Sequence, residues 1–273
     1  RYCTAIHPPS LYYNQQVPEN FHDYFVLLQR RCFCFLIAQR KSKTDSTLSI
    51  AMTLKTRCIF ELPNKTRLIL ASGSILDFES QNADAAIVNA ANEKCLGGGG
   101  VDGAISAAGG VALFNARLSL PLLDDRIRCR TGCAVMTGPD NFGQLRVNHV
   151  IHAVGPNYNR FPRKTYREVD KRLRSAYVQS LRLAQSADIK DVAFSLISAG
   201  VYRGERSLKK VLYVGISGIY KWASKASPKA LESIVLCAFL DEELKTLYKI
   251  CKKLGLPGGI VYDDEEKRGR SRE

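Results

Sequence analysis

The sequence predicts an α/β domain of three layers, in which helices cover both faces of a central sheet. Two observations lead to this fold class. Between about residues 66 and 256, short apolar runs bounded by turn residues alternate with segments that repeat apolar residues at helical spacing. Strands that alternate with helices usually form a sheet buried on both faces. Because 45% of the 273 residues are hydrophobic, the chain can build a core of sufficient size.

The apolar runs are predicted as buried strands because they are short, rich in Val, Ile, Leu and Ala, and flanked by polar turns. They comprise residues 67–71, 85–90, 134–137, 147–154, 192–197 and 233–239.

Helical spacing marks three longer segments. Residues 166–184 carry one apolar stripe with Arg and Lys on the opposite side. Ser207 is a suitable cap for a following helix that reaches Trp222. Asp241 is expected to cap a last helix, residues 241–254, with acids in its first turn and lysines in its last.

The two ends of the sequence differ from the part between them. Residues 1–65 are predicted to be an N-terminal extension of uncertain structure, because they are rich in Cys, Tyr, Gln and Arg and show no sustained period. Targeting to an organelle by residues 1–60 stays open. Residues 257–273 are predicted to be a charged, disordered C-terminal tail. The folded domain is therefore expected at 66–256.

Composition limits the partners and the compartment. The net charge of +14 favours nucleic acids, other polyanions or anionic surfaces, although a solvated basic surface without a partner explains it equally well. No run reaches the ~18 apolar residues of a membrane span, so no membrane is expected. The nine cysteines lack framework spacing and nine is odd, which favours reduced thiols and an intracellular, cytoplasmic or nuclear location.

One set of residues roughly imitates a zinc site, namely Cys129 and Cys133 followed by His149 and His152. However, residues 148–154 are predicted to form a strand, and residues an odd number apart point to opposite faces of a strand. The two histidines should diverge and be satisfied by their neighbours. We therefore expect no metal.

Four consecutive glycines provide the strongest signal in the sequence. A strand ends near Asn89, a polar turn follows, and the glycines at 97–100 lead into a short helix from about Val101. Glycines at such a junction let the backbone approach a ligand, and the exposed N–H groups at the helix N-terminus can bind phosphate.

Two common nucleotide motifs fit this loop poorly. A P-loop requires Gly-Lys-Ser/Thr after the glycines, where Val101-Asp102-Gly103 stands. A dinucleotide fingerprint is formally matched, but the loop does not follow the strand directly and no second strand presents an acid about 20 residues on. A nicotinamide-dependent oxidoreductase is therefore kept only as a distant alternative.

The sequence N-A-A-N at 89–92, a short spacer and G-G-G-G-V-D-G at 97–103 together resemble the signature of macrodomains of the hydrolytic MacroD type. The resemblance extends over residues 66–255 and includes TGCAVMTG (131–138), VIHAVGP (150–156) and SLISAGVYRGERSL (195–208). It implies a three-layer α/β/α macrodomain with a central mixed sheet that binds ADP-ribose.

The resemblance also implies roles for individual residues. The adenine would lie near Ser74 and Ile75, and the distal ribose near Asn92 and Tyr202, although Asn92 could instead stabilise the turn and Tyr202 could belong to the core. Backbone groups would enclose the diphosphate from two loops, Gly97, Gly98, Gly99, Gly100 and Val101 on one side and Ser198, Ala199, Gly200 and Val201 on the other.

Asp102, with Asn92, is the expected catalytic residue. A carboxylate at a helix N-terminus is held ionised, so it should orient a water rather than abstract a proton unaided; a plain N-cap is the alternative. The implied substrates are O-acetyl-ADP-ribose and proteins mono-ADP-ribosylated on Glu or Asp. The alternative function is a reader of ADP-ribose without turnover. No cofactor and no nucleic acid are required.

Two positions depart from the family pattern. Gly73-Ser74-Ile75 stands where macrodomains usually have Gly-Asp-Ile, with the Asp on the adenine amino group, which predicts weaker adenine recognition. Ser106 replaces a His that commonly follows the catalytic Asp, and this change is expected to leave catalysis largely intact.

Overall fold

The computed structural model describes residues 54–261. The larger part of the predicted extension, residues 1–53, and residues 262–273 of the predicted tail lie outside the described residues.

An eight-stranded mixed sheet forms the centre of the fold, in the order β4-β5-β3-β6-β7-β2-β1-β8. The inner strands β5, β3, β6, β7 and β2 are parallel to one another, whereas β4, β1 and β8 pair antiparallel with their neighbours. The strands are β1 (Lys55–Glu61), β2 (Arg67–Ser72), β3 (Ala85–Ala91), β4 (Ala134–Thr137), β5 (His149–Val154), β6 (Asp191–Ser195), β7 (Ser233–Ala238) and β8 (Gly258–Val261).

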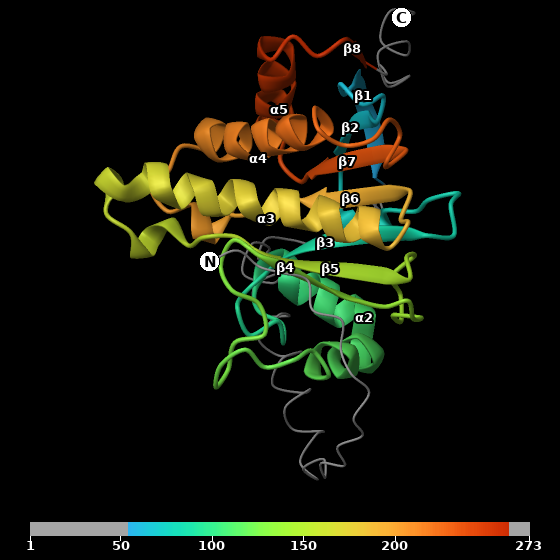
Figure 1. Ribbon diagram of the computed structural model, residues 1–273, viewed down its shortest axis with the longest axis vertical. Coiled ribbons are helices and arrows are strands. Elements are labelled where there is room, and N and C mark those ends of the chain that lie inside the picture. Colours follow the sequence, from blue (N-terminus) through green and yellow to red (C-terminus); the bar gives the residue numbers. More distant parts are fainter. Residues whose placement is uncertain (1–53, 262–273) are drawn as a thin grey trace, which may run out of the picture. The chain divides into compact units, whose positions relative to one another are not determined.

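Helices cover both faces of this sheet, which confirms the predicted three-layer α/β/α class. Three long helices lie side by side on one face, and α2 lies on the other, as Figure 1 shows. The helices are α2 (Gly100–Leu118), α3 (Tyr166–Ser186), α4 (Leu208–Ala223) and α5 (Asp241–Lys253), with short 3-10 turns η1 (Ile75–Asp77), η2 (Tyr158–Arg160), η3 (Arg163–Thr165) and η4 (Val201–Arg203).

Alternation along each inner strand produces the two apolar layers. On β6, Val192 and Phe194 belong to the core beneath α3, α4 and α5, whereas Ala193 between them belongs to the core beneath α2. A strand buried on both faces has no polar alternation to display, which is why these strands read as continuous apolar runs in the sequence.

The sheet extends beyond the predicted boundaries of 66 and 256. The strand β1 precedes residue 66, and β8 lies inside the segment predicted as a disordered tail. Both were missed because β1 mixes charged residues with the inward-facing Cys58 and Phe60, and β8 contains two glycines. Gly258 has φ 102°, and a Cβ there would lie 2.5 Å from the carbonyl oxygen of Ile59, so glycine is required for this close pairing.

Helix starts and lengths also differ in detail from the expectations. Leu240, not Asp241, is the N-cap of α5, and the carboxylate of Glu243 reaches back to the backbone N–H groups of Phe239 and Leu240 at 2.9 and 3.0 Å. Ser207 occupies the N-cap of α4, but its side chain makes no capping bond. The helix after the glycines, expected to be short, runs through Leu118 with a kink at Gly110.

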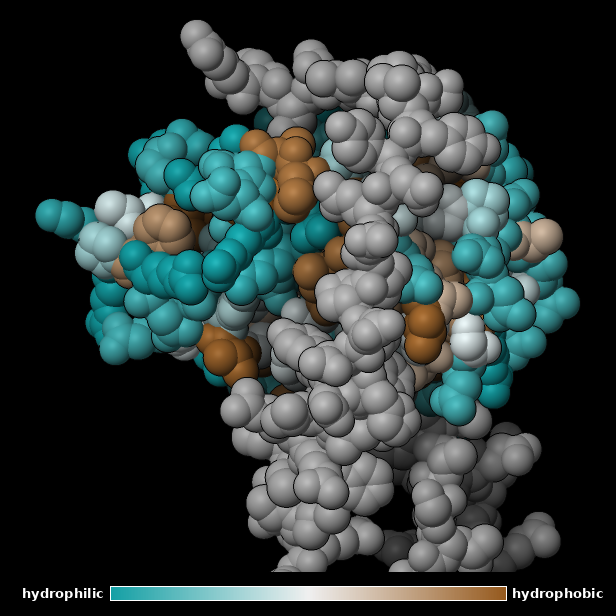
Figure 2. Space-filling model, turned by 90° about the horizontal axis from the view of Figure 1, so that it is seen from below, coloured by the Kyte–Doolittle hydropathy of each residue, from teal (hydrophilic) through white to brown (hydrophobic). Residues whose placement is uncertain are grey.

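Figure 2 shows one face on which hydrophilic residues predominate and apolar residues form separate patches. Within residues 54–261, no helix combines the length and the apolar character that a membrane crossing requires.

Candidate functional site

The loops after β3 and β6 leave neighbouring parallel strands in opposite directions. From β3 the chain continues through α2 toward β4 and β5 on one side, and from β6 it continues through α4 toward β7 on the other. Backbone pairing between the two strands ends at Val88 and Phe194, beyond which the Ser195 hydroxyl accepts from the Ala90 N–H at 3.0 Å and donates to the Val88 carbonyl at 2.7 Å. In open α/β sheets such a switch point is where ligands bind.

The glycine loop lies at this switch point. Gly97 and Gly100 have φ values of 101° and 61°, a region that favours glycine, so the path of the loop depends on them. A Cβ placed on Gly99 or Gly100 would meet no atom within 4 Å. These two residues therefore border open space at the N-terminus of α2, where backbone N–H groups attract anions.

The side chain of Asn92 holds the turn before the glycines. Its Nδ2 donates to the carbonyl of Gly97 at 2.8 Å, and its Oδ1 accepts from the Lys94 N–H at 3.0 Å. This is the turn-stabilising arrangement considered from the sequence. One Nδ2 hydrogen and one Oδ1 lone pair still have capacity for a ligand.

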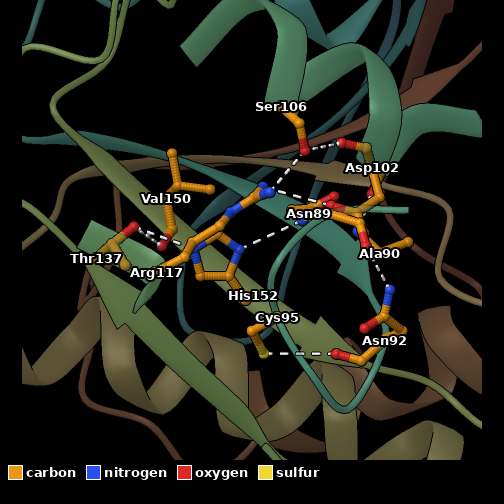
Figure 3. A network of polar contacts seen from close by, with 12 residues as sticks. Asn89, Ala90, Asn92, Cys95, Asp102, Ser106, Arg117, Thr137, Val150 and His152 are labelled. Carbon is orange, nitrogen blue, oxygen red and sulfur yellow. Dashed lines mark hydrogen bonds and ion pairs between the residues drawn. The ribbon is translucent and has the colours of Figure 1, made fainter. Parts of the chain in front are cut away.

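Asp102 is the third residue of α2, while Gly99 occupies the N-cap, so the N-cap alternative for Asp102 is wrong. The residue is 3% exposed, and its carboxylate lies beneath the glycine loop. Oδ1 accepts from Asn89 Nδ2 at 2.8 Å, whereas Oδ2 has no hydrogen-bond partner among the described residues. A Cβ on Gly98 would lie 3.0 Å from Oδ2, so this oxygen faces the loop. Figure 3 shows the surrounding contacts.

Burial is the dominant influence on the charge of Asp102. Burial raises the pKa of this carboxyl above its usual value, and the Arg117 cation and the Asn89 hydrogen bond oppose that rise only in part. The sequence instead predicted a weakly basic carboxylate held ionised by the helix N-terminus. A raised pKa makes Asp102 a stronger base than that prediction implied.

His152 completes the polar group below the loop. Its Nδ1 lies 3.3 Å from Asn89 Nδ2 and its Nε2 lies 3.0 Å from the Thr137 hydroxyl (Figure 3). Because the amide nitrogen of Asn89 can only donate, Nδ1 is the acceptor and Nε2 carries the proton. Complete burial, and then the charge of Arg117, hold the pKa of His152 well below its usual range. It is therefore neutral.

The second loop packs tightly against the end of β5. Ser198 has φ 58° and donates its hydroxyl to the Pro156 carbonyl at 2.9 Å. A Cβ on Gly155 would lie 2.2 Å from Ser198 Oγ, which explains the glycine in VIHAVGP. At the tip, Val201 is 87% exposed, and Tyr202 behind it is partly buried.

A third segment reaches the same edge from β2. Ser74 caps η1, with its Oγ accepting from the Leu76 N–H at 3.2 Å, and Ile75 is buried. The Gly73 N–H donates to the Ala238 carbonyl at 3.0 Å, so this turn lies beside the end of β7. The next residue, Phe239, is a 66% exposed aromatic that the sequence prediction had assigned to the strand.

Comparison with known proteins identifies the family. The family model for the Macro domain matches residues 88–208 of the sequence. A macro domain-containing protein of Caldanaerobacter subterraneus subsp. tengcongensis is 43% identical over 143 residues, which cover 50% of this chain and 71% of that protein. The chain belongs to the macrodomain family.

Other macrodomains extend the comparison. The O-acetyl-ADP-ribose deacetylase of Shigella flexneri is 36% identical over 185 residues, covering 68% of this chain and 94% of that protein. The Oceanobacillus iheyensis macrodomain solved with ADP superposes with TM-score 0.61 at 25% identity, covering 72% of this chain and 95% of that one. The Trypanosoma brucei macrodomain in complex with ADP-ribose gives TM-score 0.55 at 26% identity, covering 86% and 91%.

Several residues of this macrodomain site were missed from the sequence. Asn89, which begins N-A-A-N, was taken only as the end of a strand, although as a polar residue in an apolar run it signalled a buried contact. Arg117 and the contact of Ser106 with it gave no signal, because they depend on the path of α2. For the zinc alternative, no group of three or more His, Cys, Asp or Glu side chains in residues 54–261 is arranged to hold a metal ion.

Proposed function

We propose that this macrodomain binds ADP-ribose between the loops that follow β3 and β6 and hydrolyses esters of its distal ribose. O-acetyl-ADP-ribose and proteins mono-ADP-ribosylated on Glu or Asp are the proposed substrates. The observation that carries the enzymatic part is a buried Asp102 whose Oδ2 lies against the glycine loop and accepts no hydrogen bond from any residue between 54 and 261.

The proposed binding mode rests on the two loops. One side of the diphosphate would be enclosed by the first loop, Gly97, Gly98, Gly99, Gly100 and Val101. The other side would be enclosed by the second loop, Ser198, Ala199, Gly200 and Val201. Open space beside Gly99, Gly100 and Gly200 is consistent with a ligand that contacts backbone directly. Structural neighbours solved with ADP and with ADP-ribose support the same ligand class for this chain.

The adenine end would lie near Ser74, Ile75 and Phe239. These residues follow β2 and β7, which are neighbours in the sheet, so the ligand would extend along the carboxyl ends of the parallel strands. Exposed aromatic side chains offer a face on which a base can stack. Ser74 would supply at most a neutral hydrogen bond.

The proposed chemistry is attack by water on the ester carbonyl. Asp102 would accept a hydrogen bond, and then the proton, from the attacking water, while Asn92 and the ring of Tyr202 position the ribose. As the C–O bond of the ester breaks, the proton held by Asp102 passes to the departing ribose oxygen, which releases the carboxylic acid and the free ribose hydroxyl and restores the carboxylate. The raised pKa of the buried Asp102 suits this role, because a general base is most effective when its pKa approaches the working pH.

One arrangement favours a reader without turnover as the second candidate. Asn92 is engaged in holding the loop, through Gly97 and Lys94, so its contribution to the ribose would be limited. The name of the Shigella flexneri relative, a deacetylase, favours the enzyme.

The test is to compare binding and turnover in Asp102→Asn. Asparagine retains an oxygen that can accept from Asn89, so the loop should persist, while the base is lost. We expect ADP-ribose affinity by calorimetry within a few-fold of wild type, and O-acetyl-ADP-ribose turnover lower by about 10²–10⁴-fold.

Asp191→Asn is the matched control. Asp191 is also a buried carboxylate, held by hydroxyl and amide groups, but it lies at the amino end of β6, opposite the site. Its variant should keep wild-type turnover. A wild-type protein that binds ADP-ribose but cleaves no ADP-ribose ester would establish the reader, and one that does not bind ADP-ribose would overturn both candidates.

A further inference from the structure

We propose that Arg117 is a positioning residue that fixes the orientation and charge of Asp102 from behind the site, and that the kink at Gly110 exists to bring it there. The inference deepens the proposed function, on which its catalytic readout rests; its principal test does not require turnover.

The kink makes the contact possible. Asp102 and Arg117 are 15 residues apart on α2, which in a straight helix corresponds to a rise of about 22 Å, far beyond the reach of one arginine side chain. Gly110 has φ 58° and ψ −151°, so the second half of the helix turns back. Arg117 Nη2 thereby lies 3.4 Å from Asp102 Oδ1.

Ser106 anchors the guanidinium one turn after Asp102. Arg117 Nη1 donates to the Ser106 hydroxyl at 2.7 Å, and that hydroxyl donates to the backbone carbonyl of Asp102, also at 2.7 Å (Figure 3). The guanidinium therefore contacts both the carboxylate of Asp102 and Ser106, whose hydroxyl bonds the Asp102 backbone. Ser106 is the position where the family resemblance places a His.

Stability does not explain a buried pair of this kind. Arg117 is 1% exposed, yet its Nε and Nη2 make no hydrogen bond to any described residue. Burying an ion pair with incomplete hydrogen bonding commonly costs as much as it contributes, and apolar replacements are often as stable. Because burying the Arg117–Asp102 ion pair costs free energy, its presence at the end of a kinked helix points to a role for the Arg117 cation in the site.

Arg128 shows what a structural arginine looks like in the same region. It is also buried, at 8% exposed, but its guanidinium faces backbone carbonyl oxygens, those of Lys94 and Leu118 at 3.5 and 3.4 Å. It links the loop after β3 to the end of α2, and no ion pair between it and a carboxylate is found within residues 54–261, so it serves as the matched control.

The charges around Asp102 make the direction of the effect clear. The titratable groups of the cluster are Asp102 and Arg117 on α2, the neutral His152 on β5, and Cys95 in the loop between β3 and α2. Burial raises the pKa of Asp102 and Arg117 lowers it. Removing the cation should therefore raise the Asp102 pKa further.

The experiment measures the titration of Asp102 directly in the full chain. Aspartate labelled with carbon-13 at the carboxyl carbon is followed by NMR against pH, and Asp102→Asn assigns the signal. In Arg117→Met the Asp102 pKa should rise by about one to three pH units, the size typical of a lost close charge. In Arg117→Lys, which keeps a cation, the Asp102 pKa should rise by less than in Arg117→Met. Arg128→Met should lower the melting temperature and leave the Asp102 pKa at its wild-type value.

Gly110→Ala tests the kink from a distance. A Cβ there meets no atom within 4 Å, so the change acts through the positive φ alone. It should shift the Asp102 pKa in the same direction as Arg117→Met. In variants with turnover, the acid limb of the kcat/KM profile should move to higher pH by the same amount.

The outcomes separate this inference from the proposed function. An unchanged Asp102 pKa in a folded Arg117→Met protein overturns the inference, whether or not the wild type is an enzyme. A shifted pKa in a protein without turnover supports it while the hydrolase proposal fails. If Arg117→Met does not fold, the double variant Asp102→Asn/Arg117→Met decides: recovery of folding supports the pairing, and a double variant no more stable than the single one contradicts it.

Discussion

Gly98 lies directly against Asp102. A Cβ on residue 98 would be 3.0 Å from Oδ2 of Asp102 and 3.0 Å from Nδ2 of Asn92, closer than most such contacts in proteins. The loop and the two polar side chains therefore depend on the absence of a side chain here. This contact explains why the second of the four glycines is needed, although its φ is not in the left-handed region.

Gly98→Ala should consequently disturb the site more than the fold. The added methyl group would push on Asn92 and Asp102, so we expect turnover of O-acetyl-ADP-ribose to fall by at least about tenfold with little change in melting temperature. Gly218→Ala is the control, since its methyl group would also meet a side chain closely, 3.1 Å from Cγ of Arg174, but residue 218 lies in α4, outside the proposed site. Equal turnover in the two variants would show that the contact at residue 98 is without consequence.

Ser74→Asp should tighten binding of ADP-ribose several-fold. The change replaces a neutral donor or acceptor near the adenine by a charged acceptor, and charge-assisted bonds are stronger by about 1–2 kcal/mol. Asp is also a good helix cap, so it should retain the bond that Ser74 makes to the Leu76 N–H. Calorimetry measures the change, with ADP-ribose and with ribose 5-phosphate. A gain for ribose 5-phosphate as well would place the effect away from adenine.

The inner strands of the sheet could be predicted because a strand buried on both faces appears in the sequence as a continuous apolar run. The inner strands differ from the prediction by one or two residues, and the edge strand β4 has the bounds expected. The strands β1 and β8 show no such run, since β1 mixes charged residues with apolar ones and β8 contains two glycines. Their pairing depends on contacts distant in sequence, such as that between Cys58 and Val261.

For the site, the sequence predicted which loops come together but not what supports them. The glycines and Asp102 stand next to one another in the chain, so their proximity was readable. Arg117 approaches Asp102 only because Gly110 adopts a positive φ, and no local pattern distinguishes that glycine from one inside a regular helix. The change of helix direction at Gly110 depends on how the whole fold packs, so the local sequence does not predict it.

A chain that starts at Asn64 should lose cooperative folding, in contrast to the boundary that the sequence suggested. This truncation removes β1, including Phe60, which is 1% exposed, and leaves β8 without its partner. Loss of one buried Phe alone typically costs about 3–5 kcal/mol. A chain starting at Ala51 keeps the strand and should melt like the full protein. Circular dichroism during heating compares the two, and equal transitions would show that β1 is dispensable.

The buried His152 should make folding sensitive to acid. In the folded protein its pKa lies well below the usual 6.5, whereas in the unfolded chain it returns there. Unfolding therefore takes up a proton below about pH 6.5, so stability is complete above that pH and is lost as pH falls. His149, whose pKa is also lowered by burial but raised by Asp84, provides a comparison on the same strand.

We therefore expect His152→Gln to flatten the dependence of stability on pH. One proton taken up on unfolding changes the free energy of unfolding by about 1.4 kcal/mol per pH unit, and the variant should lose this slope between pH 6.5 and 5 even if it is less stable throughout. His149→Gln should flatten the slope less, since Asp84 favours the charged form of that ring in the folded state. Urea unfolding at half-unit pH steps measures both slopes. A His152→Gln protein with the full wild-type slope would show that His152 takes up no proton on unfolding, and that the ring is already charged beside Asn89.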